Sequence, residues 1–158
     1  MEELISFQNN LLAQVSNDWH RYLYVDLKVQ ERLLGIKGLR GVGKTTLLLQ
    51  YLAYGYNERG KGLYVTADHP WFYQHTLFDL AAEWYRYDGK LLLIDEVHKY
   101  PNWSRELKLI YDGHPELKVI FTSSSALDLF RGESDLSRRL ITQNLYGSII
   151  QGVSFFQA

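Results

Sequence analysis

The stretch GIKGLRGVGKTTLLL, residues 35–49, holds the residues whose types and spacing point most directly to chemistry. Gly38, Gly43, Lys44 and Thr45 fit the pattern G-x-x-x-x-G-K-[ST], in which a loop turns several backbone N–H groups toward a bound phosphate. The loop leads into a predicted helix, whose amino-terminal partial positive charge faces the same anion. Lys44 is expected to reach the β- and γ-phosphates of a nucleotide, and the Thr45 hydroxyl to bind the Mg²⁺ that bridges them. The expected nucleotide-binding residues are Gly38, Arg40, Gly41, Val42, Gly43, Lys44, Thr45 and Thr46.

A second constellation, LLLIDEVHKYP at residues 91–101, lies downstream of the loop. Four apolar residues place Asp95 at the carboxyl end of a buried strand, where doubly wound sheets bind their ligands. A carboxylate there can hold the water shell of Mg²⁺ opposite Thr45. Glu96 is a second carboxylate beside this metal site, where it can orient and deprotonate the water that attacks the γ-phosphate. His98 is expected to pack or to form a hydrogen bond rather than to act in catalysis.

The elements that must position these residues can be read from the hydrophobic periodicity of the chain. Helices are expected over residues 1–15, 45–56, 75–87, 102–111, 126–130 and 134–141. Extended segments are expected over residues 21–27, 32–38, 62–67, 90–96, 118–125 and 143–150. Strands that are continuously apolar are buried on both faces, and their alternation with helices indicates a mostly parallel sheet between two helical layers. The predicted fold is α/β and doubly wound, with a five-stranded sheet, helices on both faces and a phosphate-binding loop (P-loop).

Composition limits what this fold can bind. The chain has 158 residues, of which 46% are hydrophobic, enough for one globular domain. Lys and Arg total 17 against 18 Asp and Glu, so the chain has no net positive charge that would attract nucleic acid or anionic lipid. Nucleic acid could still bind locally, by stacking of bases on aromatic residues such as those of HPWFYQH, but the charge does not indicate it. Cysteine is absent, and no apolar run approaches the roughly 18 residues of a membrane span. We therefore expect a cytoplasmic protein with no membrane contact.

The segments GIKGLRGVGKTTLLLQYL, LLLIDEVHKYPNWSRELK, VIFTSSSALDL and LSRRL together resemble predicted bacterial and archaeal ATPases of the AAA+ superfamily. This resemblance implies an ATPase that uses ATP and Mg²⁺, with Glu96 as the general base. It also implies an additional strand: KVIFT should lie between the strand before the P-loop and the strand LLLID. A polar sensor of the γ-phosphate would follow that strand, at Thr122 or Ser124. Arg138 or Arg139 could stabilise transition-state charge, in cis or from a neighbouring subunit.

The resemblance also suggests how the chain is organised. Residues 1–30 are expected to form an amino-terminal helix and an extended lead-in, and residues 31–148 the P-loop ATPase core, within a single domain. Members of the family usually continue into a helical lid and a further domain, and residues 149–158 resemble the beginning of such a continuation.

Three classes of function remain open on this sequence. The first is an ATP hydrolase that acts as a switch or motor, with a homo-oligomer or a protein as partner. The second is a P-loop kinase, in which the loop strand and the Asp95 strand would be adjacent. The third is a nucleotide-regulated interaction module without turnover. Solvated side chains are the simpler alternatives for Arg40, Ser124, Arg138 and Arg139.

Overall fold

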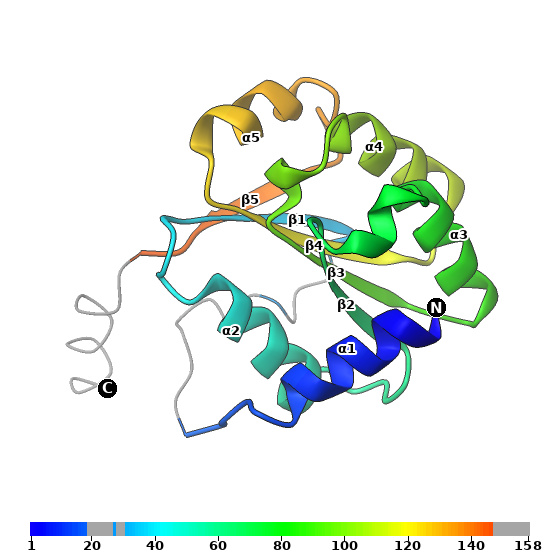
Figure 1. Ribbon diagram of the computed structural model, residues 1–158. Coiled ribbons are helices and arrows are strands. Elements are labelled where there is room, and N and C mark those ends of the chain that lie inside the picture. The colour runs from blue at the N-terminus through cyan, green and yellow to red at the C-terminus, as the bar shows by residue number, and fades with distance from the viewer. Residues whose placement is uncertain (19–26, 28–30, 147–158) are drawn as a thin grey trace.

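A computed structural model describes residues 1–18, 27 and 31–146 of the chain, and within them five strands form one parallel sheet (Figure 1). The strands are β1 (Leu33–Lys37), β2 (Gly62–Thr66), β3 (Leu91–Asp95), β4 (Lys118–Ser123) and β5 (Ile141–Asn144). Their order across the sheet is β2-β3-β4-β1-β5, and every pairing is parallel. The additional strand predicted between the loop strand and the LLLID strand is therefore confirmed as β4.

Helices cover both faces of this sheet, as predicted. They are α1 (Glu2–Leu12), α2 (Lys44–Gln50), α3 (Leu77–Arg86), α4 (Trp103–Gly113) and α5 (Ala126–Glu133), with a π-helical turn η3 (Tyr51–Gly55) and the 3₁₀ turns η4 (Pro70–Tyr73) and η5 (Val97–Lys99). Figure 1 shows α1 and α2 on one side of the sheet and α3, α4 and α5 on the other. Because each strand is followed by a helix that runs back, the carboxyl ends of β1, β3 and β4 meet at one edge.

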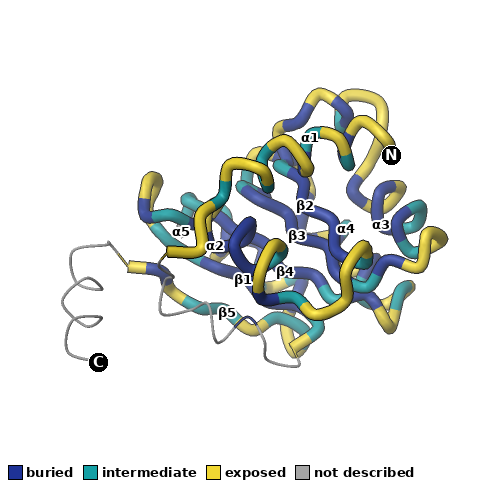
Figure 2. Tube along the Cα trace, turned by 90° about the horizontal axis from the view of Figure 1, so that it is seen from below, coloured by how far each residue is buried: buried dark blue, intermediate teal, exposed yellow. Residues whose placement is uncertain are grey.

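Because both faces of the sheet are covered, β3 is buried at every residue, and β1 and β4 at every residue except Lys37 and Lys118 (Figure 2). Their alternating side chains supply two separate cores: Phe121 packs on the face of α3 and α4, and Ile120 on the face of α2. Gly35 makes room for Phe121, since a Cβ at Gly35 would lie 2.8 Å from the Phe121 ring. Burial on both faces explains why these strands read as continuous apolar runs.

The edge strand β2 is capped by the amino-terminal helix. The Gln8 side-chain oxygen accepts a hydrogen bond of 2.6 Å from the backbone N–H of Tyr64, and the Phe7 ring lies 5.0 Å from the His69 ring. A side chain here takes the place of a neighbouring strand, which prevents this edge from pairing with another chain. The helix predicted over residues 1–15 is therefore present but shorter, at residues 2–12, and it lies against the edge strand β2.

Two predictions near the carboxyl end were wrong. Residues 134–139 form turns rather than a helix, because Arg138 has φ 66°, a left-handed conformation that cannot continue a right-handed helix. The last strand begins at Ile141 rather than at Gln143, because residues 141–144 pair with β1 from Leu34 to Lys37. The extended segment predicted at residues 21–27 lies outside the described residues except for Leu27, as does the predicted continuation at residues 149–158.

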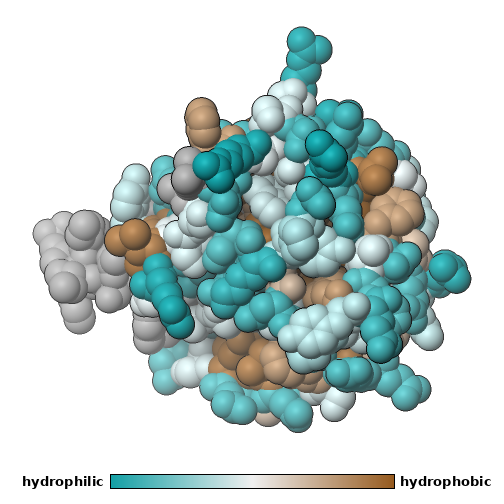
Figure 3. All heavy atoms as spheres, turned by 45° about the horizontal axis from the view of Figure 1, so that its top comes forward, coloured by the Kyte–Doolittle hydropathy of each residue, from teal (hydrophilic) through white to brown (hydrophobic). Residues whose placement is uncertain are grey.

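The surface is mainly polar on the face shown in Figure 3, where hydrophobic residues gather only in small areas. Among the described residues, the more exposed large apolar side chains include Leu39 in the P-loop and Phe130 on α5. Within the same residues, no helix has both the length and the apolar character needed to cross a membrane.

Candidate active site

The P-loop connects β1 to α2 and takes a conformation that its glycines permit. Gly41 and Gly43 have φ 84° and 96°, in the region that other residues rarely adopt. Gly38 is needed for a different reason, since a Cβ there would lie 2.8 Å from the backbone oxygen of Leu145. Val42 is buried in the core beside α2, so its side chain anchors the loop to the core. The loop is thus held at its base while its tip stays open.

Lys44, the first residue of α2, reaches back over this loop. Its Nζ donates hydrogen bonds to the backbone oxygens of Gly38 at 2.7 Å and Leu39 at 2.8 Å. Burial lowers the pKa of the Lys44 ammonium, while the nearby carboxylates of Asp95 and Glu96 act in the opposite direction. The ammonium is therefore fixed at the concave side of the loop by two neutral carbonyls.

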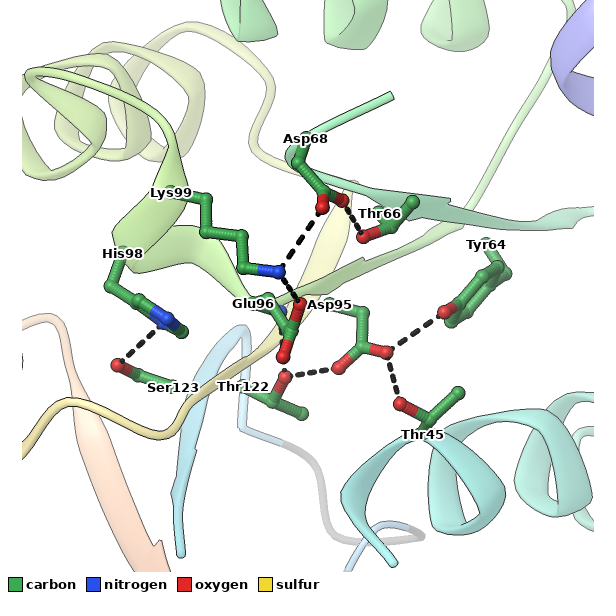
Figure 4. A network of polar contacts seen from close by, with 10 residues as sticks. All are labelled: Thr45, Tyr64, Thr66, Asp68, Asp95, Glu96, His98, Lys99, Thr122 and Ser123. Carbon is green, nitrogen blue, oxygen red and sulfur yellow. Dashed lines mark hydrogen bonds and ion pairs between the residues drawn. The ribbon is translucent and has the colours of Figure 1, made fainter. Parts of the chain in front are cut away.

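Asp95, the last residue of β3, lies where that strand faces α2, because its side chain shares a face with Leu93. Its Oδ2 accepts hydrogen bonds from the Thr45 hydroxyl at 2.5 Å and from the Tyr64 hydroxyl at 2.8 Å (Figure 4). Its Oδ1 accepts a further hydrogen bond from the Thr122 hydroxyl. With 3% of its surface exposed, the Asp95 carboxylate is solvated almost wholly by these three hydroxyls.

Glu96 leaves the strand in a sharp turn that aims its side chain at the same edge of the sheet. Its backbone has φ 52°, and its N–H donates to the Thr122 hydroxyl at 2.9 Å. The Glu96 carboxylate forms an ion pair of 2.5 Å with Lys99, which also pairs with Asp68 at 3.1 Å. The Thr66 hydroxyl donates to Asp68 in turn, so a polar chain runs from β4 to the end of β2 (Figure 4).

The three consecutive hydroxyl side chains at the carboxyl end of β4, Thr122, Ser123 and Ser124, have different surroundings. Thr122 is fully buried behind Asp95, as described above. Ser123 is also buried, and its hydroxyl lies 3.2 Å from His98 Nδ1, so His98 forms the hydrogen bond expected of it. Ser124 is half-buried and borders the space over the P-loop. Of the two sensor candidates, Ser124 is therefore the one that faces open space.

A cleft of 270 Å³ unites most of the predicted site residues. Its walls are the P-loop, the start of α2, the end of β3 and the turn after β4. The cleft is lined by Arg40, Gly41, Gly43, Lys44, Thr45, Thr46, Asp95, Glu96 and Ser124. Gly38, Val42 and Thr122 support it from behind.

Arg138 and Arg139 lie elsewhere. They precede the amino end of β5, whereas the P-loop follows the carboxyl end of the neighbouring β1. The Arg139 guanidinium forms two hydrogen bonds with Asp112, at 2.9 and 3.1 Å, near the end of α4. Arg138 is exposed. The structure therefore does not bring either arginine to the cleft within one chain, and action in trans stays a prediction.

Three residues of the site were not predicted from the sequence: Tyr64, Asp68 and Lys99. Tyr64 is the single aromatic residue in the otherwise aliphatic and small strand GLYVTA, which is a weak signal that its hydroxyl has a partner. Lys99 follows Glu96 by three residues, a spacing that brings side chains together in a helical turn. Asp68 carried no comparable signal, because its contact with Lys99 depends on the pairing of β2 with β3.

Comparisons with known proteins identify the family and the fold of this chain. The family model described as an AAA domain matches residues 30–151. The uncharacterized protein MJ1637 of Methanocaldococcus jannaschii is 34% identical over 132 residues, covering 78% of this chain and 27% of that protein. The Walker-type ATPase PABY2304 of Pyrococcus abyssi has a similar fold, with a TM-score of 0.50, 17% identity, and coverage of 78% of this chain and 51% of that one. DnaA from Aquifex aeolicus, bound to AMPPCP, gives a TM-score of 0.51 and 19% identity over 85% of this chain and 49% of its own. This chain thus spans about a quarter of the curated relative and about half of each structural neighbour.

Proposed function

This chain belongs to the AAA domain family of P-loop ATPases, and from that premise we propose that it binds ATP with Mg²⁺ and hydrolyses it as a switch or motor. The observation that carries the proposal is the contact between Thr45 and Asp95, at 2.5 Å, with Glu96 beside it on the cleft. A hydroxyl at the start of the P-loop helix and a carboxylate at the end of a buried strand are the groups that hold magnesium beside nucleotide phosphates.

Phosphate binding falls to the P-loop and Lys44. The loop borders the cleft with backbone at Gly41 and Gly43, and α2 begins at its floor, so N–H groups and the helix dipole favour an anion there. Lys44 is already turned toward the loop by its bonds to two carbonyls. A triphosphate would give this ammonium charged oxygens in place of neutral ones, which strengthens each hydrogen bond.

Two residues at the cleft have side chains that can bind magnesium. Thr45 and Asp95 offer a hydroxyl and a carboxylate oxygen, the hard ligands that Mg²⁺ prefers. Tyr64 and Thr122 hold the Asp95 carboxylate from two further directions, so its orientation is fixed before any ion arrives. Held by Thr45 and Asp95, Mg²⁺ would supply positive charge against the phosphates of a bound nucleotide.

The chemical step is assigned to Glu96, with Ser124 as the sensor. Glu96 is the carboxylate on the cleft wall that is not enclosed by hydroxyl donors, so it can accept a proton from an attacking water. Ser124 presents a hydroxyl to the same cleft and can contact the γ-phosphate. Arg138 is exposed and away from the cleft of its own chain, so it would act on the nucleotide of a neighbouring subunit. A homo-oligomer would then be the complete enzyme. Neither a protein partner nor nucleic acid is singled out by the described surface.

The strand order argues against the kinase alternative. P-loop kinases were expected to place the loop strand beside the Asp95 strand, whereas here β4 separates β1 from β3. Glu96 lines the same cleft, where a hydrolase requires a base that activates water.

The experiment is ATP and GTP turnover by the full chain, with Mg²⁺ or with EDTA, and with or without DNA. Glu96→Gln is the decisive variant, since it keeps the size of the side chain but removes its charge and basicity. We expect Mg²⁺-dependent ATP hydrolysis that falls by roughly 10²- to 10⁴-fold in Glu96→Gln, with ATP still bound. Binding without turnover in the wild type would favour the interaction module, and phosphoryl transfer to an added acceptor would favour the kinase.

A further inference from the structure

Lys99 lies between two carboxylates, on the side of Glu96 that is turned toward β2 (Figure 4). Its Nζ is 2.5 Å from Glu96 Oε2 and 3.1 Å from Asp68 Oδ2. Within the described part of the chain, Lys99 is the one side chain that contacts the Glu96 carboxylate. The backbone brings the two residues together, because Glu96 immediately precedes the 3₁₀ turn η5 and its backbone oxygen accepts a hydrogen bond of 3.0 Å from the N–H of Lys99, the last residue of the turn.

Asp68 fixes the other side of Lys99. The Thr66 hydroxyl donates to Asp68 Oδ1 at 2.6 Å, and this bond, with the Lys99 ammonium, lowers the pKa of the Asp68 carboxyl. Hydrogen bonds to Glu96 and Asp68 raise the pKa of the Lys99 ammonium. Thr66 pairs with Asp95 across β2 and β3, so the residue that holds Asp68 belongs to the sheet. Lys99 therefore connects the carboxylate of Glu96 to Asp68, which follows the neighbouring strand β2.

We propose that Lys99 is a positioning residue for Glu96: it holds Oε2 of the carboxylate and leaves Oε1 to receive the proton of the attacking water. The inference rests on the proposed function of Glu96 as base. A carboxylate tied at one oxygen loses the rotations that would carry the other away from the water, and misplacement by about 1 Å can cost about 10²-fold in rate. Stability is a poor explanation for the lysine, because its side chain is 40% exposed and exposed ion pairs contribute little to folding.

The test compares Lys99→Met with wild type in steady-state ATP hydrolysis by the full chain. Methionine keeps much of the length of the side chain but removes the ammonium. We expect kcat to fall by roughly 10- to 100-fold while KM and the affinity for ATP stay unchanged, which is the signature of a group that acts only in the chemical step. Lys99→Arg, which keeps a cation with several donors, should restore most of the rate. In a Glu96→Gln background, Lys99→Met should cause no further loss, because the carboxylate to be positioned is gone.

Lys90 provides a matched control. It too lies between two carboxylates, 3.5 Å from Asp88 and 3.0 Å from Glu116, but at the amino end of β3, away from the cleft. Lys90→Met should leave kcat at the wild-type value, and urea denaturation should show all variants folded.

Several results would overturn the inference: an unchanged or raised kcat in Lys99→Met, a loss of ATP affinity as large as the loss of rate, or a further loss in the Glu96→Gln background. Failure of the inference is distinct from failure of the proposed function. A wild type without ATP turnover removes both, whereas an active wild type, an inactive Glu96→Gln and a fully active Lys99→Met remove only the role of Lys99.

Discussion

Replacing Tyr64 by Phe tests whether hydroxyl donors hold the Asp95 carboxylate. Tyr64 is 2% exposed, and its hydroxyl donates to Asp95 Oδ2 at 2.8 Å. Burial and the adjacent Asp95 charge raise the pKa of this phenol, so it is a donor at neutral pH. Hydrogen bonds to charged groups contribute roughly 1.5–3 kcal/mol. Because Thr45 and Thr122 would still donate to Asp95, the loss should lie at the low end, about 1.5 kcal/mol.

The assay is urea denaturation followed by circular dichroism. For a chain of this size, about 1.5 kcal/mol corresponds to a fall in melting temperature of about 3–6 °C, and the urea midpoint should fall with an unchanged slope. Tyr54→Phe is the matched control. It deletes the same atom from a tyrosine that is 50% exposed and donates to the Val15 backbone oxygen at 3.0 Å, so its effect should stay below about 0.5 kcal/mol.

Equal effects of the two variants would refute the reasoning, because they would mean that the buried hydroxyl contributes no more than a solvated one. A second measurement links this contact to function. If Tyr64 orients Asp95 for magnesium, Tyr64→Phe should raise the Mg²⁺ concentration needed for half-maximal turnover by roughly 10- to 100-fold, as the loss of a partner behind a metal ligand does elsewhere.

Three further variants address other parts of the site. Lys44→Ala should abolish ATP binding and turnover together, since it removes the charge that offsets phosphate repulsion, and an unfolded product in circular dichroism would instead give the loop a structural role. Gly38→Ala should destabilise the fold by roughly 1–3 kcal/mol in urea denaturation, because its Cβ would lie 2.8 Å from the Leu145 backbone oxygen. A urea midpoint equal to that of the wild type would show instead that the loop can shift. Arg138→Ala should lower turnover only at protein concentrations at which chains associate, and a loss in dilute, monomeric protein would contradict action in trans.

Most of the sheet could be predicted because its strands carry a strong local signal. LLLID is apolar at every position before Asp95, and such a run is stable only where both faces are covered. The carboxyl-end rule then placed Asp95 and the P-loop at one edge without knowledge of the contacts between them. By contrast, the position of β4 between β1 and β3 came from resemblance to a family, since hydrophobic periodicity is silent about strand order.

The parts that could not be predicted depend on single backbone angles or on contacts between distant segments. The LSRRLI segment has helical spacing, but a left-handed Arg138 ends any helix there, and nothing in its residue type indicates this. The bridge from Lys99 to Asp68 joins residues that are adjacent only because β2 pairs with β3. Site residues that lie within one sequence motif could therefore be predicted. Site residues that meet only because two strands pair could not.

The strand order and the chemistry of the site are connected through Thr122. Its hydroxyl donates to Asp95 Oδ1 and accepts from the N–H of Glu96, so a single buried group supports both acidic residues. A hydroxyl can do this because it has one donor and two acceptor positions. Alanine at this position would leave a buried carboxylate oxygen and a backbone N–H each without that partner, at a cost of roughly 1–3 kcal/mol for each group. In a sheet with β1 directly beside β3, the neighbouring strand would be β1, whose residue in register with Thr122 is Ile36, and Ile36 has no hydroxyl. The position of β4 between β1 and β3 therefore matters for the site as well as for the sheet. It supplies the Thr122 hydroxyl, which holds the proposed metal ligand Asp95 and the proposed base Glu96 side by side.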